Sequence, residues 1–220
     1  TNHLKHYKTD KMNKAIIAID SFKGCLTSEE AGIAVMKGIK TIFPDCEILL
    51  FPIADGGEGM LDVLISATQG KYRTLPAHGP LMELIQTQYG ISGDGQTALI
   101  EMAAISGLPL VPEEKRNPML TTTYGTGELI LDALEQGCRR FIVGIGGSAT
   151  NDAGLGMLQA LGFRFLDKRG NLLGTGGKIM SQVASIDTSA VHPALKETRF
   201  TIACDVHNPF CGSDGAAYIF

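Results

Sequence analysis

The chain has 220 residues, of which 44% are apolar and 19% are charged, a composition typical of globular proteins and not of disordered ones. Its 23 acidic and 19 basic residues are interspersed and leave a formal net charge of -4, so no basic surface for nucleic acid or an anionic membrane is expected. No apolar run approaches the roughly 18 residues of a membrane span, and no leader is recognised at the start. The composition favours small-molecule chemistry in the cytoplasm.

The first part of the chain is predicted to alternate strands and helices. Residues 1–11 are polar and precede Met12, so we treat them as an extension outside the fold. The expected elements are a doubly buried strand over 15–19, a helix over 27–43, a strand over 48–51 and a helix over 58–68. The first helix opens with a capping box of Thr27 and Glu30, and the second is closed by Gly70. This order predicts parallel strands, with Asp20 and Asp55 at one sheet edge.

The pattern changes from residue 71 onward. Ile85 to Ile91 alternates, and a turn over 92–95 leads into Thr97–Met102, which predicts an antiparallel hairpin. The elements expected beyond it are a helix over 126–136, a strand over 140–145, a helix over 150–161, a strand over 163–166 and a strand over 200–205. We therefore predict two α/β domains, over 12–75 and 76–220.

Neither cysteine nor histidine is arranged as a metal or redox site. The five cysteines are widely spaced and form no C-x-x-C pair, and the five histidines form no H-E-x-x-H motif. We expect free thiols that are mostly buried, and no histidine-bound metal.

The segment from Gly144 to Asp152 leaves a predicted strand and enters a predicted helix. Its glycines allow backbone N–H groups to approach an anion, and the helix N-terminus adds partial positive charge. Gly144, Gly146 and Ala149 also fit the dinucleotide motif G-x-G-x-x-A, with Asp167 about 20 residues on as the ribose-binding acid. The carboxylate of Asp152 would compete with a pyrophosphate there, which favours phosphoryl transfer with a cation instead.

Further candidate residues follow other predicted strands. Asp20 and Lys23 follow the first strand, Asp55 follows the second, and Asp205 ends a later one. An isolated Asp in a turn is more often a local cap, and a lysine is more often solvated, but several acids at strand ends favour a ligand role. The hydroxyl-rich run from Thr121 to Glu128 precedes a helix and suits either helix capping or anion binding.

Taken together, six motifs resemble the glycerate kinase family in their order and spacing from Met12 to Phe220. They are Asp20-Ser21-Phe22-Lys23-Gly24, Ala54 to Gly59, Lys115 to Pro118, Thr121 to Leu129, Gly144 to Asp152, and Ala203 to Val206 with Asn208-Pro209. The resemblance implies ATP, Mg²⁺ and D-glycerate, with 2-phosphoglycerate as the more expected product than 3-phosphoglycerate. It also implies a Rossmann-like or flavodoxin-like domain with a second α/β domain inserted, and a site in the cleft between them.

This chain departs from the family in its length, because members continue well beyond the segment that matches Gly215 to Phe220. The first domain is therefore expected to be incomplete, which leaves the activity of this chain open. An NAD(P)-dependent oxidoreductase that uses the Gly144 loop, or a noncatalytic binding fragment, remain the alternatives. The oligomeric state is not predicted.

The resemblance and the motifs lead to specific residue hypotheses. The predicted catalytic residues are Asp152, Asp55 and Lys23. The predicted substrate-binding and phosphate-binding residues are Asp20, Ser21, Lys23, Thr122, Thr123, Gly125, Thr126, Gly146, Gly147 and Ser148. The predicted magnesium ligands are Asp205 and Asp55.

Overall fold

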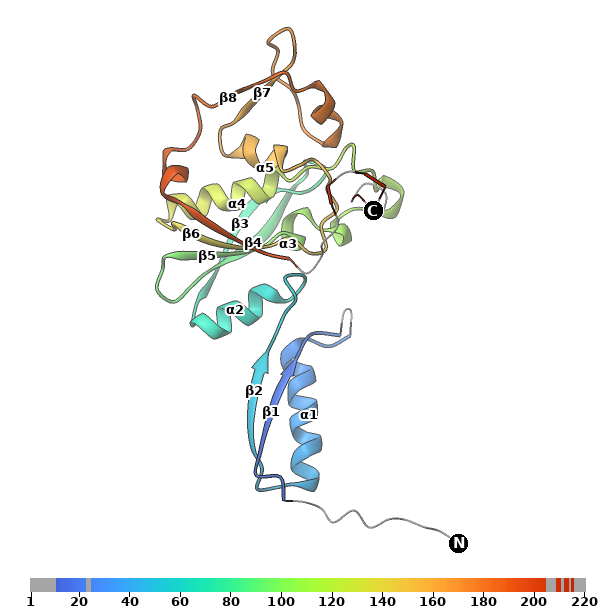
Figure 1. The fold of residues 1–220 in the computed structure, drawn as a ribbon, viewed down its shortest axis with the longest axis vertical. Helices are drawn as coiled ribbons and strands as arrows, with labels where there is room; N and C mark the ends of the chain where they lie inside the picture. Colours follow the sequence, from blue (N-terminus) through green and yellow to red (C-terminus); the bar gives the residue numbers. More distant parts are fainter. Residues whose placement is uncertain (1–10, 23–24, 205–208, 211, 214, 216–220) are drawn as a thin grey trace. The chain divides into compact units, whose positions relative to one another are not determined.

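The computed structural model describes residues 11–22, 25–204, 209–210, 212–213 and 215. The protein is a mixed α/β chain that divides into two compact units, Thr1–Ala54 and Asp55–Phe220 (Figure 1). This division falls before the helix α2 (Met60–Thr68), whereas the predicted domain boundary lies after it. The helix α2 belongs to the second unit because its Leu61 and Ile65 pack against Leu99 of that unit.

The first unit contains β1 (Lys14–Ile19), α1 (Ser28–Ile42) and β2 (Glu47–Pro52). The two strands are parallel and in register from Lys14 opposite Glu47 to Ile19 opposite Pro52. The predicted capping box is confirmed, since Glu30 N donates to Thr27 Oγ1 at 3.2 Å and Thr27 N donates to Glu30 Oε2 at 2.9 Å. The predicted β-α-β order is therefore confirmed for this unit.

The expectation that β1 is buried on both faces is wrong for the described residues. Ile17 is 6% exposed, but its neighbour Ile16 is 66% exposed. Within this unit the single helix α1 covers one face of a two-stranded sheet, and alternate side chains point to opposite faces. On the covered face the packing is tight, because a Cβ on Gly32 would lie 2.3 Å from Leu50 Cδ1. The other face is apolar and is left uncovered by the described residues of this unit.

The second unit is built on a five-stranded sheet in the order β3-β4-β5-β6-β9. The strands are β3 (Lys71–His78), β4 (Leu84–Ile91), β5 (Thr97–Glu101), β6 (Arg140–Gly144) and β9 (Arg199–Ala203). The predicted hairpin of β4 and β5 is confirmed, and β5, β6 and β9 are parallel to one another. The sequence did not predict β3, an edge strand that contains Pro76 and pairs antiparallel with β4.

Helices cover both faces of this sheet (Figure 1). On one face, Leu61 and Ile65 of α2 pack against Leu99 of β5. On the other face, α4 (Tyr124–Glu135) buries its apolar side chains in the larger core cluster, which includes Ile100 of β5. The helix α5 (Leu155–Ala160) packs on α4 so closely that a Cβ on Gly127 would lie 2.3 Å from Met157 O. The result is a layered α/β unit with two apolar cores.

The rest of the second unit consists of short elements. They are α3 (Ala103–Ser106), η1 (Leu108–Leu110), η2 (Glu113–Lys115), β7 (Arg164–Leu166), η3 (Gly177–Gln182), β8 (Ser185–Asp187) and η4 (Pro193–Glu197). At the end of α2 the left-handed residue is Gln69, with φ of 52°, and not the predicted Gly70. Among the described residues, no helix is long and apolar enough to cross a membrane.

Four of the five cysteines lie in the described part of the chain, and none of these four is in a disulfide. Cys46 and Cys138 are buried, whereas Cys25 and Cys204 are exposed. The expectation of free thiols is confirmed for these four, but only half of them are buried. Cys211 lies outside the described residues.

Candidate functional site

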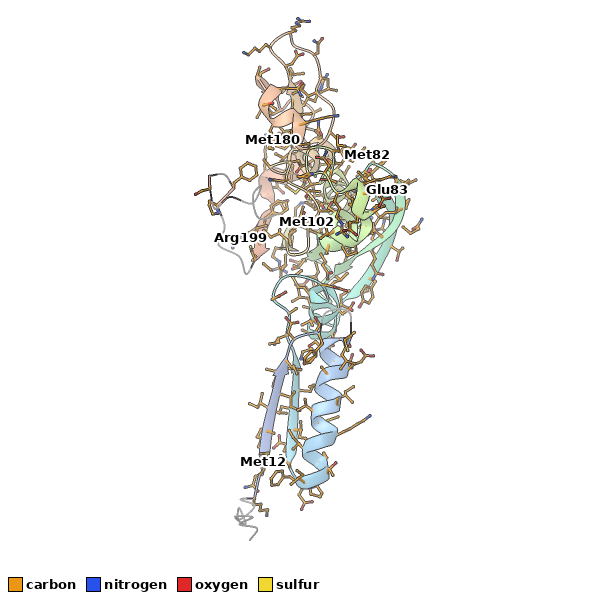
Figure 2. All side chains as sticks on the ribbon, turned by 90° about the vertical axis from the view of Figure 1, so that its right-hand side faces the viewer. Met12, Met82, Glu83, Met102, Met180 and Arg199 are labelled. Atoms are coloured by element: carbon orange, nitrogen blue, oxygen red, sulfur yellow. The ribbon has the colours of Figure 1, made fainter. Side chains whose placement is uncertain are left out.

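The candidate site lies at the carboxyl edge of the five-stranded sheet. The parallel strands β5, β6 and β9 end there at Glu101, Gly144 and Ala203, which are neighbours in the strand register. Met102, labelled in Figure 2, follows β5 and donates its N–H to Gly144 O at 2.9 Å. In open α/β sheets, ligands bind beyond the carboxyl ends of the strands, so this edge is where a ligand is expected.

The loop from Asp55 to Gly59 is packed against this edge through its glycines. Gly56 is buried with φ of 96°, and a Cβ on it would lie 2.8 Å from Ala203 O. A Cβ on Gly144 would lie 2.4 Å from Gly56 O, and Gly146 N donates to that same oxygen at 3.3 Å. Side chains at these positions would push the backbones apart. Two of the predicted motifs, the Asp55 loop and the Gly144 loop, are thus brought together.

Asp55 is exposed at this edge, and its Oδ1 accepts a hydrogen bond from Gly57 N at 2.9 Å. That contact is a local turn of the kind that Asp often forms. Glu58, in the same loop, is also exposed. The loop therefore presents two carboxylates to solvent beside the exposed Gly147 of the neighbouring loop. Carboxylate oxygens are ligands of the kind that divalent cations such as Mg²⁺ prefer.

Glu101 is a residue of this edge that the sequence reasoning missed. It is 8% exposed at the end of β5, and Leu61 N donates to its Oε2 at 3.2 Å. Burial raises the pKa of Glu101, hydrogen bonds from the Leu61 and Gly59 backbone oppose that rise, and the charges of Asp62 and Glu58 add to it. The feature of the sequence that could have indicated Glu101 is its place as a single acidic residue at the end of an apolar strand.

Asp152 is more completely buried than Glu101, with 1% of its surface exposed. Its carboxylate accepts hydrogen bonds from three backbone amides, those of Thr123 at 2.9 Å, Gly154 at 3.0 Å and Gly156 at 3.1 Å. It also accepts from the hydroxyls of Thr122 at 3.3 Å and Thr123 at 3.1 Å. These contacts join the loop after β6 to the segment before α4.

The helix after this loop begins later than predicted, at Leu155 and not at residue 150. Asp152 therefore precedes the helix and does not lie in its first turn, because Ala153 and Gly154 take left-handed φ angles of 53° and 73°. The amides of Gly154 and Gly156, at the start of this helix, donate to the carboxylate of Asp152. The expected competition between Asp152 and a phosphate stays a prediction.

The hydroxyl-rich segment from Thr121 to Thr126, which leads into the first turn of α4, is mostly buried. Thr121 Oγ1 donates to Ala149 O at 2.7 Å, and the hydroxyls of Thr126 and Ser106 lie 2.9 Å apart. Gly125 has no room for a side chain, since a Cβ there would lie 1.9 Å from His78 O. These contacts give the segment a role in packing, and the predicted ligand role of Thr122, Thr123, Gly125 and Thr126 stays a prediction.

The remaining predicted residues are placed as follows. Ser148 Oγ lies 2.6 Å from Thr150 Oγ1, within the loop after β6. In the first unit, Ser21 N donates to Asp20 Oδ1 at 2.6 Å, directly after β1. That Asp20 and Asp55 are neighbours stays a prediction, since they belong to different units. Lys23 and Asp205 lie outside the described residues. Within the described part of the chain, no group of three or more metal-binding side chains is found.

The sheet topology contradicts the dinucleotide-binding interpretation. That fold needs the strand after the glycine loop and its helix to pair parallel with β6. The next strand, β7, instead pairs antiparallel with β8 in a separate sheet, and β6 pairs with β5 and β9. Asp167 lies in a turn, where hydrogen bonds, those from Asn171 foremost, lower its pKa. The match to G-x-G-x-x-A is therefore a local coincidence.

Comparison with known proteins gives a consistent result. A model described as the glycerate kinase family matches residues 15–220. The chain is 52% identical over 207 residues to a glycerate kinase from Haemophilus influenzae, covering 94% of this chain and 55% of the relative. It is also 52% identical over 207 residues to a glycerate 2-kinase from Escherichia coli, covering 94% and 54%. The chain spans about half the length of the curated relatives it matches.

A solved structure is similar as well. The crystal structure of a putative glycerate kinase 2 from Salmonella typhimurium LT2 superposes with a TM-score of 0.85 at 45% sequence identity. The match covers 95% of this chain and 56% of that one. The fold of the present chain is thus the fold of the corresponding part of that protein.

Proposed function

Because the chain belongs to the glycerate kinase family, we propose that it forms part of an ATP-dependent kinase that phosphorylates D-glycerate, to 2-phosphoglycerate rather than 3-phosphoglycerate. The observation that supports the proposal most directly is the packing of the Asp55 loop against the Gly144 loop at the carboxyl edge of the sheet. Phosphoryl transfer depends mainly on positioned phosphate-binding backbone and on carboxylates that hold cations. This edge offers both kinds of group.

The residues at this edge fit a magnesium ion. Mg²⁺ prefers oxygen ligands, and in phosphoryl-transfer enzymes it is bound by one or two carboxylates together with substrate phosphates and water. Asp55 is exposed where such a complex would lie, and Asp205 is the second predicted ligand. When bound with ATP, the ion neutralises charge that develops on the phosphates. The loop over 146–148 would lie against the phosphates.

Among the predicted catalytic residues, exposure favours Asp55 over Asp152 for contact with substrate. The carboxylate of Asp152 already accepts five hydrogen bonds and is 1% exposed. Asp55 could accept the proton of the attacking hydroxyl or hold the cation. Lys23, with Asp20 and Ser21, is assigned to the substrate carboxylate or phosphate. The role of Asp152 as a base stays a prediction.

We also propose that the first unit belongs to a Rossmann-like or flavodoxin-like domain into which the second unit is inserted, with a boundary before α2 and not at the predicted residue 76, because α2 and β3 pack within the second unit. The apolar face of β1 and β2 that α1 leaves uncovered within the unit supports this, since an exposed Ile16 is expected to be buried in a complete domain. The curated relatives are long enough to supply the missing elements. The predicted cytoplasmic location stays a prediction.

A coupled assay of ADP release with D-glycerate, ATP and Mg²⁺ tests the function. It is run on this chain and on a chain extended by the remaining half of a relative. Asp55→Asn should lower turnover by about 10²- to 10⁴-fold, whereas Asp187→Asn, in a turn beside Ser189, should leave turnover unchanged. Turnover in the extended chain alone would identify this chain as an incomplete part. Absence of turnover in both would refute the proposal, and ATP binding without turnover would favour a binding fragment.

A further inference from the structure

Glu101 caps a helix that does not lie next to it in the sequence. The N-cap residue of α2 is Gly59, which has no side chain to accept a hydrogen bond from the first amides of the helix. Those amides need an acceptor when they are buried. Glu101, 40 residues away from Leu61, supplies it through Oε2, and Gly59 also donates to this carboxylate. A negative charge at this end of the helix is also favoured by the helix dipole.

This cap acts directly on the loop that presents the exposed carboxylates. The loop from Asp55 to Glu58 runs straight into α2, so fixing the start of the helix fixes one end of the loop. Its other end is held by the close contacts of Gly56 with Gly144. Glu101 and Gly144 are themselves paired in the register of β5 and β6. The loop is therefore held at two points by the ends of two neighbouring strands.

A glutamate at position 101 is unexpected in a buried environment, so its presence there calls for a physical reason. A buried carboxylate is costly unless it is well hydrogen-bonded, and an apolar residue of similar size would suit the surrounding core better. An apolar residue would, however, leave the amides of Gly59 and Leu61 without their acceptor. The buried Glu101 is thus explained by what it holds in place.

We propose that Glu101 is a positioning residue, which fixes the Asp55 to Gly59 loop at the carboxyl edge of the sheet and so sets the place of the Asp55 carboxylate. That this position serves phosphoryl transfer rests on the proposed function. Glu101 does not itself contact the substrate in this scheme. A small displacement of a group that binds the cation or the substrate is sufficient to slow a reaction by orders of magnitude.

Hydrogen exchange tests the first part of the proposal without any substrate. In Glu101→Ala, the amides of Gly59 and Leu61 should exchange about 10-fold faster or more, because a buried hydrogen bond is lost. Glu101→Gln keeps one acceptor oxygen and should give an intermediate effect. The amides of α4 should be unaffected in both variants. Unchanged exchange at Gly59 and Leu61 in Glu101→Ala would overturn the proposal.

The matched control is Glu83→Gln. Glu83, labelled in Figure 2, also accepts a backbone hydrogen bond, from Leu81 N at 3.0 Å, but it lies in the turn between β3 and β4. The same exchange measurement should show no change at Gly59 or Leu61 in this variant. A change there equal to that of Glu101→Gln would mean that any lost glutamate loosens α2, which would also overturn the proposal.

A second readout separates positioning from general stability. Binding of Mg²⁺ with a fluorescent N-methylanthraniloyl ADP should weaken by roughly 10-fold in Glu101→Ala and less in Glu101→Gln, with the melting temperature of Glu101→Gln near that of the wild type. Altered exchange with unaltered binding would reject the role of Glu101 in the site. If neither the wild-type chain nor its extended form binds the nucleotide, the proposed function fails, and the exchange data alone decide whether Glu101 holds the loop.

Discussion

Replacing Asp152 by Asn distinguishes a structural from a catalytic role for this carboxylate. The two oxygens of Asp152 accept three amide and two hydroxyl hydrogen bonds at 1% exposure. An Asn oxygen in the place of Oδ2 keeps the amides of Thr123 and Gly156, but its NH₂ group then faces Gly154 N. Two donors cannot bond to each other, so one partly buried amide loses its partner.

The loss of stability expected for Asp152→Asn follows from these contacts. An unpaired buried donor costs about 1–3 kcal/mol, and the bonds that remain are weaker because the acceptor is no longer charged. Together these effects predict that Asp152→Asn lowers the free energy of unfolding by about 2–4 kcal/mol, a large part of the roughly 5–15 kcal/mol typical of a domain. The midpoint of urea unfolding, followed by circular dichroism, measures the change.

Asp167→Asn is the matched control for this experiment. Asp167 also accepts from the amides two and four residues ahead, those of Arg169 at 2.7 Å and Asn171 at 2.9 Å, but in a turn open to solvent. Water can replace a lost partner there, so the midpoint should move much less than in Asp152→Asn. An equal shift in both variants would show that burial is not the cause.

The unfolding midpoint and the turnover of Asp152→Asn together decide whether Asp152 has a structural or a catalytic role. If Asp152→Asn keeps the wild-type unfolding midpoint while turnover falls by about 10²- to 10⁴-fold, Asp152 is the catalytic base and its contacts are incidental. If the midpoint falls and turnover per folded molecule is kept, the carboxylate serves to join the loop after β6 to the segment before α4. The comparison needs an active extended chain for the turnover measurement.

Two further predictions concern buried groups of the second unit. Tyr89→Phe removes the hydroxyl that donates to Asp132 Oδ2 at 2.7 Å beside Arg73, and should lower the free energy of unfolding by about 1.5–3 kcal/mol, as measured by urea unfolding. The folded-state pKa of Glu101 is raised, chiefly by burial, so its contribution to stability is present at low pH and is lost as the pH rises through that pKa. Wild-type stability relative to Glu101→Gln should therefore decline as the pH rises above the ordinary glutamate pKa of about 4.3, and a constant difference would contradict this.

Several features of the fold were predictable because their causes are local. The capping box of Thr27 and Glu30 involves residues three positions apart, and it marked the start of α1 correctly. The turn after Ile91 marked the hairpin of β4 and β5, because turn residues and the alternation of apolar residues are both recognised within a short segment. The order of motifs along the chain was likewise sufficient to identify the family. These inferences needed no knowledge of distant contacts.

Other predictions failed where distant residues decided the outcome. The helix expected from residue 150 starts at Leu155, after the left-handed Ala153 and Gly154, and Asp152 before it accepts a hydrogen bond from Thr123 N, 29 residues away in the chain. The dinucleotide-binding alternative would require β7 to pair with β6, but β7 pairs antiparallel with β8 in a separate sheet. Short apolar strands carry no local signal that names their partner, so pairing is settled only by the packed structure.

The sequence by itself determined the capped helix, the hairpin, the β-α order and the glycine-rich and acidic segments, because each depends on neighbours along the chain. Only the tertiary structure decided which of these segments meet and which carboxylates are buried. Asp55 and Asp152 have similar glycine-rich surroundings in the sequence, yet one is exposed and the other fully buried. Glu101 is recognised as part of the edge only when β5 and α2, 40 residues apart at the contact, are packed together. Burial and hydrogen-bond partners depend on long-range packing, and so does the chemistry available to each carboxylate.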